Sequence, residues 1–262
     1  MDPLLTVSGL TMDFGGIRAL DHVHLHLVQG EIFALIGPNG AGKTTLFNCL
    51  TGVYTPSGGD VLLKPPGQIP QRLNGLKPNR ITEKGVARTF QNIRLFPNMS
   101  TLENVMIGRH CRSRAQVFGA IFRTPATVCE EKAIVGTSLA LLERVGLAEH
   151  AHVLAKNLPY GAQRRLEIAR ALATEPLLLL LDEPAAGMNP RETVELEELI
   201  SSINGDGLTI LLIEHDMRLV MRLSDHIFVM DYGRKIAEGT PEQIRHNPEV
   251  IKAYLGEGTD HA

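Results

Sequence analysis

The sequence is poor in aromatic residues and has little excess of either charge. It contains no tryptophan, and Phe, Trp and Tyr together make up 5% of its 262 residues. This scarcity argues against platforms of aromatic side chains on which nucleic-acid bases stack. The formal net charge is -3, from 26 basic and 29 acidic residues. Since a protein that coats nucleic acid needs a basic surface, we expect no nucleic-acid partner.

The chain also lacks long apolar runs and a disulfide framework. Its longest uninterrupted apolar runs, such as Leu177 to Leu181, are far shorter than the ~20 residues that cross a bilayer. The N-terminus shows no basic segment followed by an apolar stretch, as a secretory signal would. The three cysteines, Cys49, Cys111 and Cys129, are odd in number and are not spaced like metal ligands. These absences predict a soluble protein of the reducing cytoplasm.

What is present is the composition of an ordinary globular protein, with 44% hydrophobic and 21% charged residues. Strand-like apolar runs alternate with helix-like segments, which predicts an α/β fold with a mostly parallel sheet. The expected strands are 31–36, 177–181, 209–213 and 226–230, and the expected helices begin at Lys43 or span 162–173 and 191–203. The pattern of residues from about 95 to 158 predicts a helical insertion. It includes the segment 138–147, whose apolar residues have helical spacing.

An alternating segment near the N-terminus predicts a half-buried strand. In residues 21–28, Val23, Leu25 and Leu27 point one way, and three histidines point the other. His22, His24 and His26 share that second face. Because no cysteine or carboxylate completes a ligand set, we interpret them as a polar sheet face rather than a metal site.

The sharpest motif is a glycine-rich loop between an expected strand and an expected helix. It reads Gly37-Pro-Asn-Gly-Ala-Gly-Lys-Thr44, a phosphate-binding loop in the context that this motif requires. Glycines let the backbone N–H groups turn inward, and the helix N-terminus adds partial positive charge. Lys43 is expected to reach the β- and γ-phosphates, and the Thr44 hydroxyl to ligate Mg²⁺. The full set of expected nucleotide contacts here is Gly37, Pro38, Asn39, Gly40, Ala41, Gly42, Lys43, Thr44 and Thr45.

Two carboxylates follow the apolar run 177–181. Asp182 ends the run and is expected at the carboxyl edge of the sheet, where open α/β folds bind nucleotides. We expect Asp182 to hold Mg²⁺ through water and Glu183 to orient or deprotonate the attacking water. Together with the phosphate loop, these residues predict a nucleoside triphosphatase.

Residues between and after these motifs resemble the ABC ATPases. Leu158-Pro-Tyr-Gly-Ala-Gln-Arg-Arg-Leu-Glu-Ile-Ala-Arg-Ala-Leu172 resembles the family's signature motif, in which a Leu-Ser-Gly-Gly-Gln loop opens a helix. Four further segments match other family features in the same order along the chain. These are Phe14 (the aromatic that stacks on adenine), Gln91 (the Q-loop glutamine, which senses metal and γ-phosphate), residues 185–189 (the D-loop) and His215 (the switch histidine at the γ-phosphate).

This resemblance covers essentially the whole chain and implies a fold and a set of partners. It implies a P-loop NTPase (RecA-like) core with an N-terminal antiparallel β subdomain in residues 1–94 and 166–262, and an inserted α-helical subdomain in 95–165. ATP and Mg²⁺ are the implied ligands. A second ATPase subunit, identical or related, would supply signature and D-loop contacts to ATP in trans. The implied trans residues are Leu158, Pro159, Tyr160, Gly161, Ala162, Gln163 and Asn189.

Several stretches resemble one branch of the family, the branched-chain amino acid uptake ATPases. They are 94–105, 160–170, 183–190 and 239–255. The resemblance implies a peripheral subunit on the cytoplasmic face of the membrane, bound to transmembrane permease subunits and acting indirectly with an extracytoplasmic substrate-binding protein. Closure of the dimer would act on the permeases through the helical subdomain near residues 91–96.

Alternatives to this branch remain open. Urea-uptake and lipopolysaccharide-export ATPases share many of the same sequence motifs. The segment 111–125 resembles an insertion that favours the amino acid or urea types, and its run Val117–Phe122 would either dock on a membrane partner or pack inside the helical subdomain. A soluble ABC ATPase acting on DNA or the ribosome is disfavoured, because the chain has neither a coiled-coil insertion nor two ATPase domains. The hypothesis of a small-molecule kinase is disfavoured, because it does not account for the motif in residues 158–170 or for His215.

The signature loop departs from the family pattern at two positions. Pro159 stands where the family has serine, and Ala162 stands where it has glutamine. Proline has neither a hydroxyl nor a backbone N–H, so only the loop backbone, including the Gly161 N–H, can donate to phosphate. In the D-loop, Ala186 and Asn189 replace the usual Ser and Asp. We therefore expect an ATP-bound dimer with fewer side-chain contacts across it.

Pro159→Ser should restore a donor to the signature loop. One added hydrogen bond is worth about 0.5–1.5 kcal/mol, so ATP-driven dimerisation should strengthen a few-fold and turnover should change with it. Light scattering with ATP and a phosphate-release assay measure the two effects. If neither changes, the missing hydroxyl is irrelevant.

Overall fold

The computed structural model describes residues 3–112 and 125–255. The run Val117–Phe122 lies outside the described residues, as does nearly all of the segment 111–125. Within the described part of the chain, no helix is both long and apolar enough to span a membrane. The three cysteines are free, and burial raises the pKa of the Cys49 thiol to about 11.

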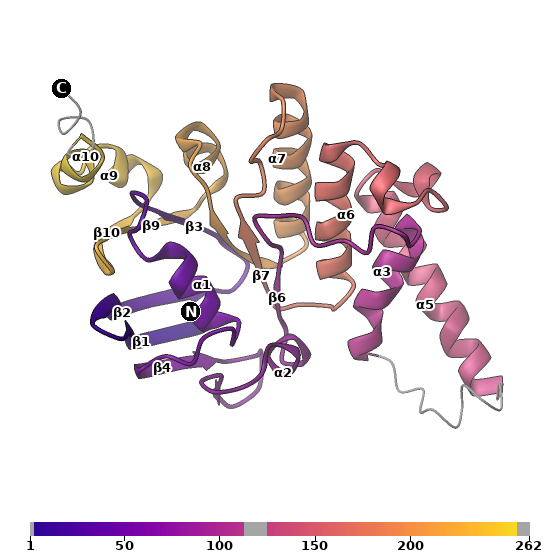
Figure 1. The fold of residues 1–262 in the computed structure, drawn as a ribbon, viewed down its shortest axis with the longest axis horizontal. Helices are drawn as coiled ribbons and strands as arrows, with labels where there is room; N and C mark the ends of the chain where they lie inside the picture. Colours follow the sequence, from indigo (N-terminus) through magenta and orange to yellow (C-terminus); the bar gives the residue numbers. More distant parts are fainter. Residues whose placement is uncertain (1–2, 113–124, 256–262) are drawn as a thin grey trace.

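The centre of the molecule is a six-stranded sheet in the order β10-β9-β3-β8-β7-β6 (Figure 1). Neighbours from β9 to β6 pair in parallel, and β10 is antiparallel to β9. The predicted α/β fold with a mostly parallel sheet is confirmed. The strands are β3 (Ile32–Ile36), β6 (Val86–Arg88), β7 (Leu178–Asp182), β8 (Thr209–Ile213), β9 (His226–Asp231) and β10 (Arg234–Gly239).

A second, antiparallel sheet lies beside the first and has the order β2-β1-β4-β5. In β2, Val23, Leu25 and Leu27 are buried, while the three histidines of the opposite face are exposed. The predicted polar sheet face is thus confirmed. The strands are β1 (Pro3–Phe14), β2 (Ile17–Val28), β4 (Gly58–Leu63) and β5 (Gln71–Arg72).

Helix α1 (Lys43–Leu50) packs between the two sheets. Its side chains Leu46, Phe47 and Leu50 are fully buried in one apolar cluster together with residues of β1, β2, β3 and β8. Full burial of each such side chain contributes about 1.5–3 kcal/mol. The helix that begins with the phosphate-loop lysine is therefore held on both sides by the core.

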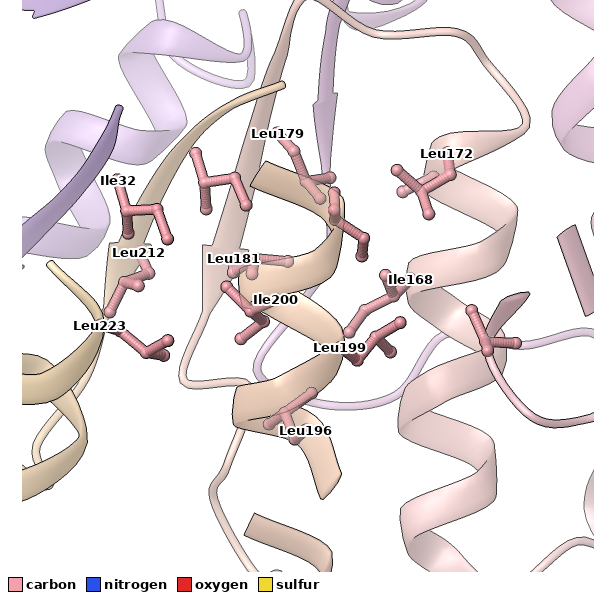
Figure 2. Close-up of a cluster of buried hydrophobic side chains, with 14 of the residues drawn as sticks. Ile32, Ile168, Leu172, Leu179, Leu181, Leu196, Leu199, Ile200, Leu212 and Leu223 are labelled. Carbon is pink, nitrogen blue, oxygen red and sulfur yellow. The ribbon is translucent and has the colours of Figure 1, made fainter. Parts of the chain in front are cut away.

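The other face of the central sheet is covered by α6 (Tyr160–Leu172), α7 (Pro190–Gly205) and α8 (Met217–Leu223). Figure 2 shows Ile200 of α7 beside Leu181 of β7 and Leu199 beside Ile168 of α6, and Leu196 belongs to the same buried cluster. With Ile203, these positions follow the i, i+3, i+4, i+7 spacing of a helix with one buried face.

The boundaries of helices and strands differ from the predicted ones by one or two residues, and at α7 a side-chain cap explains the difference. α7 begins at Pro190, one residue before the predicted start, because the Asn189 side chain caps it by accepting from the N–H groups of Arg191 and Glu192. α6 begins at Tyr160 rather than at 162. β7 begins and ends one residue later than the predicted run 177–181.

A helical subdomain lies at the far end of the sheet from α9 and α10 (Figure 1). It contains α3 (Thr101–Arg109) and α5 (Pro125–Arg144), and α6 runs across the boundary proposed at 165/166. In the described residues of this region the predicted helical character is confirmed, and they also form three short 3₁₀ turns. Smaller elements elsewhere are α2 (Pro78–Glu83), α9 (Pro241–Arg245) and α10 (Pro248–Leu255).

Close packing of α3 on the end of α6 requires a glycine at position 108. A Cβ at Gly108 would lie 2.3 Å from the Arg170 carbonyl oxygen and 2.9 Å from the Ala173 Cβ. At Gly136 in α5, by contrast, a Cβ would meet nothing within 4 Å. The two glycines form a matched pair, since both lie in helices of the same subdomain.

Gly108→Ala should lower the free energy of unfolding by about 1–3 kcal/mol, because α3 and α6 must separate. Gly136→Ala should raise it by about 0.5–1 kcal/mol, because alanine restricts the unfolded chain and favours helix. Denaturant unfolding followed by circular dichroism measures both. Equal stability of the two variants would contradict the close contact.

Candidate functional site

The phosphate loop lies between β3 and α1, as predicted, and two of its glycines have no space for a side chain. A Cβ at Gly37 would lie 2.0 Å from the Met230 carbonyl oxygen, and one at Gly42 would lie 2.7 Å from the Ala19 carbonyl oxygen. Both have positive φ, 149° and 100°. The loop is therefore pressed against β9 and β2, and only glycine is accommodated at these two positions.

Lys43 is held under this loop. Its Nζ donates to the carbonyl oxygens of Gly37 at 2.6 Å and Pro38 at 2.9 Å, and the residue is 6% exposed. A buried ammonium requires such partners. The lysine is thus already placed at the loop whose N–H groups are expected to hold phosphate.

A cavity of about 300 Å³ opens above the loop. Three distant segments that sequence analysis singled out separately, at Gln91, Glu183 and His215, all reach it. The structure therefore brings these residues together with the loop. The lining residues are Ala19, Asn39, Gly40, Ala41, Gly42, Lys43, Thr44, Thr45, Gln91, Glu183 and His215.

The Glu183 carboxylate contacts both Gln91 and His215, the two other polar residues predicted for this site. Gln91 Nε2 donates to Glu183 Oε2 at 2.8 Å, and His215 Nε2 lies 2.8 Å from Glu183 Oε1. Glu183 has φ 48°, in the left-handed region, which costs a non-glycine residue about 1–3 kcal/mol. The strained turn after β7 aims this carboxylate at the cavity, where it can polarise a water molecule.

A buried carboxylate that sequence analysis missed supports this group. Glu214 Oε1 accepts from the Ala185 N–H at 2.8 Å, and Glu214 Oε2 accepts from the His215 N–H at 3.1 Å. Burial raises the pKa of Glu214, while these backbone donors oppose the rise. The side chain ties the turn after Glu183 to the segment of His215. A carboxylate directly after the apolar run 209–213 was the signal available.

Asp182 is buried at the end of β7 and paired with an arginine. Arg88 Nη2 lies 2.7 Å from Asp182 Oδ2, with side-chain exposures of 8% and 5%. The guanidinium of Arg88 also lies over the rings of Phe47 and Phe90 and donates to Asn48 Oδ1 at 2.6 Å. Arg88 was not predicted; an arginine in a short strand next to Gln91 was its only signal.

The oxygen donors here suit Mg²⁺. The hydroxyl of Thr44, the amide oxygen of Gln91 and the carboxylate of Asp182 are hard oxygen donors, the type that Mg²⁺ prefers, and their binding of the metal stays a prediction. Among the described residues, no group of three or more His, Cys, Asp or Glu side chains could hold a metal by itself.

Phe14 does not line the cavity. Its ring is 40% exposed and packs edge-on against Tyr54, with the ring centroids 5.2 Å apart. Phe14 lies at the β1–β2 hairpin, and Ala19 of the same hairpin does line the cavity. Its contact with adenine stays a prediction.

The signature-loop residues also lie outside the cavity of their own chain. Leu158 and Ala162 are buried, and Gln163 Nε2 donates to the Leu158 carbonyl at 2.9 Å. Pro159 is the N-cap residue of α6 and makes no side-chain cap hydrogen bond, while Tyr160 Oη donates to the Ala186 carbonyl. Asn189 is engaged as the cap of α7. The trans contacts expected of Leu158, Pro159, Tyr160, Gly161, Ala162, Gln163 and Asn189 stay predictions.

Comparison with known proteins assigns a family to this arrangement. Residues 20–186 match the model of the family described as "ABC transporter", and residues 234–260 match "Branched-chain amino acid ATP-binding cassette transporter". The chain is 53% identical over 256 residues to the high-affinity branched-chain amino acid transport ATP-binding protein LivG of Escherichia coli (strain K12). That alignment covers 97% of this chain and 98% of LivG.

Solved structures agree with this assignment. The ADP conformation of MJ1267, an ATP-binding cassette of an ABC transporter, superposes with a TM-score of 0.83 at 30% identity, covering 98% of this chain and 100% of that one. A dimeric bacterial ABC transporter cassette, MJ0796, superposes with a TM-score of 0.75 at 25% identity, covering 90% and 98%. The RecA-like α/β fold with its helical subdomain is confirmed. The chain belongs to the ABC transporter family as an ATP-binding subunit, an ATPase whose activity is coupled to transport.

Proposed function

We propose that this chain hydrolyses ATP to energise the import of branched-chain amino acids through permease subunits that it binds at the cytoplasmic face of the membrane. The observation that carries the proposal is the single cavity where the phosphate loop meets Gln91, Glu183 and His215. The assignment of the substrate class rests on the similarity to LivG and on the family match of residues 234–260. An extracytoplasmic binding protein would deliver the amino acid to the permeases.

ATP hydrolysis at this cavity needs a held phosphate chain and an oriented water. The loop N–H groups and Lys43 would hold the phosphates, and Glu183 would polarise the attacking water. His215 and Gln91, both hydrogen-bonded to Glu183, would hold its carboxylate in place and contact the γ-phosphate when it is present. Mg²⁺, held by Thr44, Gln91 and Asp182, would neutralise phosphate charge.

Two copies, or one copy and a related subunit, would enclose two ATP molecules. The signature loop is outside the cavity of its own chain, so completing a site with it requires a second chain. The dimeric cassette MJ0796 is a precedent for such an assembly in this fold. ATP binding would then stabilise the closed dimer, and hydrolysis would release it.

A groove of about 770 Å³ at the helical subdomain is the proposed permease contact. It is lined by α3, α6, β6 and residues on both sides of Gln91, so a permease segment seated here would lie next to the Q-loop glutamine. Phe96 is 46% exposed in it, which leaves apolar area for a partner. Lining residues include Phe90, Arg94, Phe96, Ile107 and Arg170.

Glu183→Gln should keep ATP binding but lower kcat by about 10²–10⁴, the range for loss of a general base. The variant should also accumulate as an ATP-bound closed dimer, which size-exclusion chromatography with ATP detects. Glu198→Gln, an exposed position on α7, is the matched control. Normal turnover of Glu183→Gln would remove Glu183 from this role.

Lys43→Ala should weaken ATP binding by more than tenfold, about 1.4 kcal/mol or more, because the only buried ammonium at the described phosphate loop is lost. Equilibrium titration with ATP measures the affinity. Lys132→Ala, at an exposed site on α5, serves as control. Unchanged affinity of Lys43→Ala would refute the assigned phosphate loop.

Reconstitution tests the transport proposal. The chain co-expressed with its permeases in proteoliposomes, supplied with binding protein and ATP, should accumulate radiolabelled leucine, isoleucine or valine. Accumulation should stop in the Glu183→Gln variant. Uptake of urea but of no branched-chain amino acid would contradict the substrate assignment while leaving the ATPase intact.

A further inference from the structure

Tyr160 binds the D-loop of its own chain. The D-loop comprises residues 185–189, and Tyr160 Oη donates to the Ala186 carbonyl at 2.9 Å. The ring also lies against Gly187, where an added Cβ would be 3.3 Å from it. Gly187 has φ 78°, so the loop follows a path that favours glycine beneath the ring. The signature loop and the D-loop therefore touch through one side chain.

Arg164, one helical turn later on α6, connects Tyr160 to the Q-loop, residues 90–94. Its Nε donates to Tyr160 Oη at 3.2 Å, and its Nη1 donates to the Phe90 carbonyl at 2.7 Å. Its Nη2 donates to the Gln91 carbonyl. The side chain is only 3% exposed, so these bonds are made away from solvent. All three nitrogens of the planar guanidinium are thus used in one bridge.

Glu167 completes the attachment from the same helix. Its Oε1 accepts from the N–H groups of Phe90 at 3.3 Å and Arg94 at 3.4 Å. Glu167 also pairs with Arg164 at 3.5 Å, and its side chain is 2% exposed. The helix thus holds carbonyl groups of the Q-loop through an arginine and N–H groups through a carboxylate. Because both charges are buried and paired, the attachment is costly to break.

The contacts to the D-loop and to the Q-loop are linked, because Arg164 donates to the hydroxyl of Tyr160. Tyr160 holds the D-loop, which follows Glu183. Arg164 holds the backbone of Gln91, whose side chain donates to Glu183. A shift of the Q-loop by the distance of a hydrogen bond would therefore pull on Arg164, then on Tyr160 and the D-loop.

We propose that Tyr160 and Arg164 are positioning residues that make the Q-loop, the signature loop and the D-loop of one chain move as a unit. The inference rests on the proposed function in assigning these loops to ATP. It also assigns a role to Tyr160, the residue directly after the departure at Pro159. Since Pro159 provides no side-chain cap, the tyrosine beside it orients the start of α6 through the D-loop.

Hydrogen exchange on the full chain without nucleotide tests the link. Tyr160→Phe removes only Oη, yet amides that Tyr160 does not touch, Phe90 and Arg94, should exchange at least fivefold faster. Arg164→Lys should in turn speed exchange of Ala186 and Met188, which Arg164 does not touch. This reciprocity follows if one opening motion includes both loops. Tyr232→Phe and Arg165→Lys, at a hairpin and at the neighbouring position on α6, are the controls.

Kinetics of the reconstituted transporter give the second measure. Tyr160→Phe should lower kcat for ATP several-fold with KM little changed, because the variant keeps the whole phosphate loop and the backbone of the signature loop. Effects of Tyr160→Phe confined to residues 185–189, with Phe90 and Arg94 unchanged, would overturn the proposal. So would equal losses in the Tyr232→Phe control. The exchange measurement needs no ATP, so it remains decisive even if the transport assay fails.

Discussion

Parallel pairing of β3 with β8, and of β8 with β7, brings the carboxyl ends of three strands to one edge of the sheet. The phosphate loop follows β3, Glu183 follows β7, and His215 follows β8 shortly after Ile213. In an antiparallel sheet, alternate strands would have carried these residues to opposite edges. The cavity exists because the strand register places all three segments within reach of one another. The apolar clusters on both faces of the sheet hold that register.

Charged groups at this edge already have partners within the chain. Lys43 is bound by carbonyl groups of its loop, Asp182 by Arg88, and Glu183 by Gln91 and His215. Low-dielectric surroundings make an unpaired charge expensive, so these pairings stabilise the site in the absence of nucleotide. In the proposed function, nucleotide would exchange some of these pairings for contacts to phosphate. Such an exchange would link ligand binding to the positions of the Q-loop and the His215 segment, because those segments carry the partners.

Much of this arrangement was predictable from local sequence. Three local patterns each indicate a single structure, because their spacing and side-chain size leave few alternatives. They are the glycine-rich loop before Lys43, the apolar run before Asp182 and the alternation around Val23. Gln91 and His215 were identified through their resemblance to family motifs rather than through spacing. Arg88, Glu214 and Arg164 were not foreseen. Their roles depend on partners 94, 29 and 74 residues away, at Asp182, Ala185 and Phe90, and no local pattern reports such a pairing.

Tyr160 illustrates the same division within a single motif. From the sequence, the resemblance implies only that Tyr160 lies in a loop expected to contact ATP in trans, and no local pattern indicates what its side chain contacts. By itself, the sequence determined the fold class, the phosphate loop, the carboxylates at the end of β7 and directly after it, and the family. Tertiary structure alone decided which buried charges pair with one another and that Tyr160 contacts the D-loop. The physical reason is that backbone conformation and burial follow from neighbours along the chain, whereas the partners of a buried polar group are chosen by packing between elements far apart in sequence.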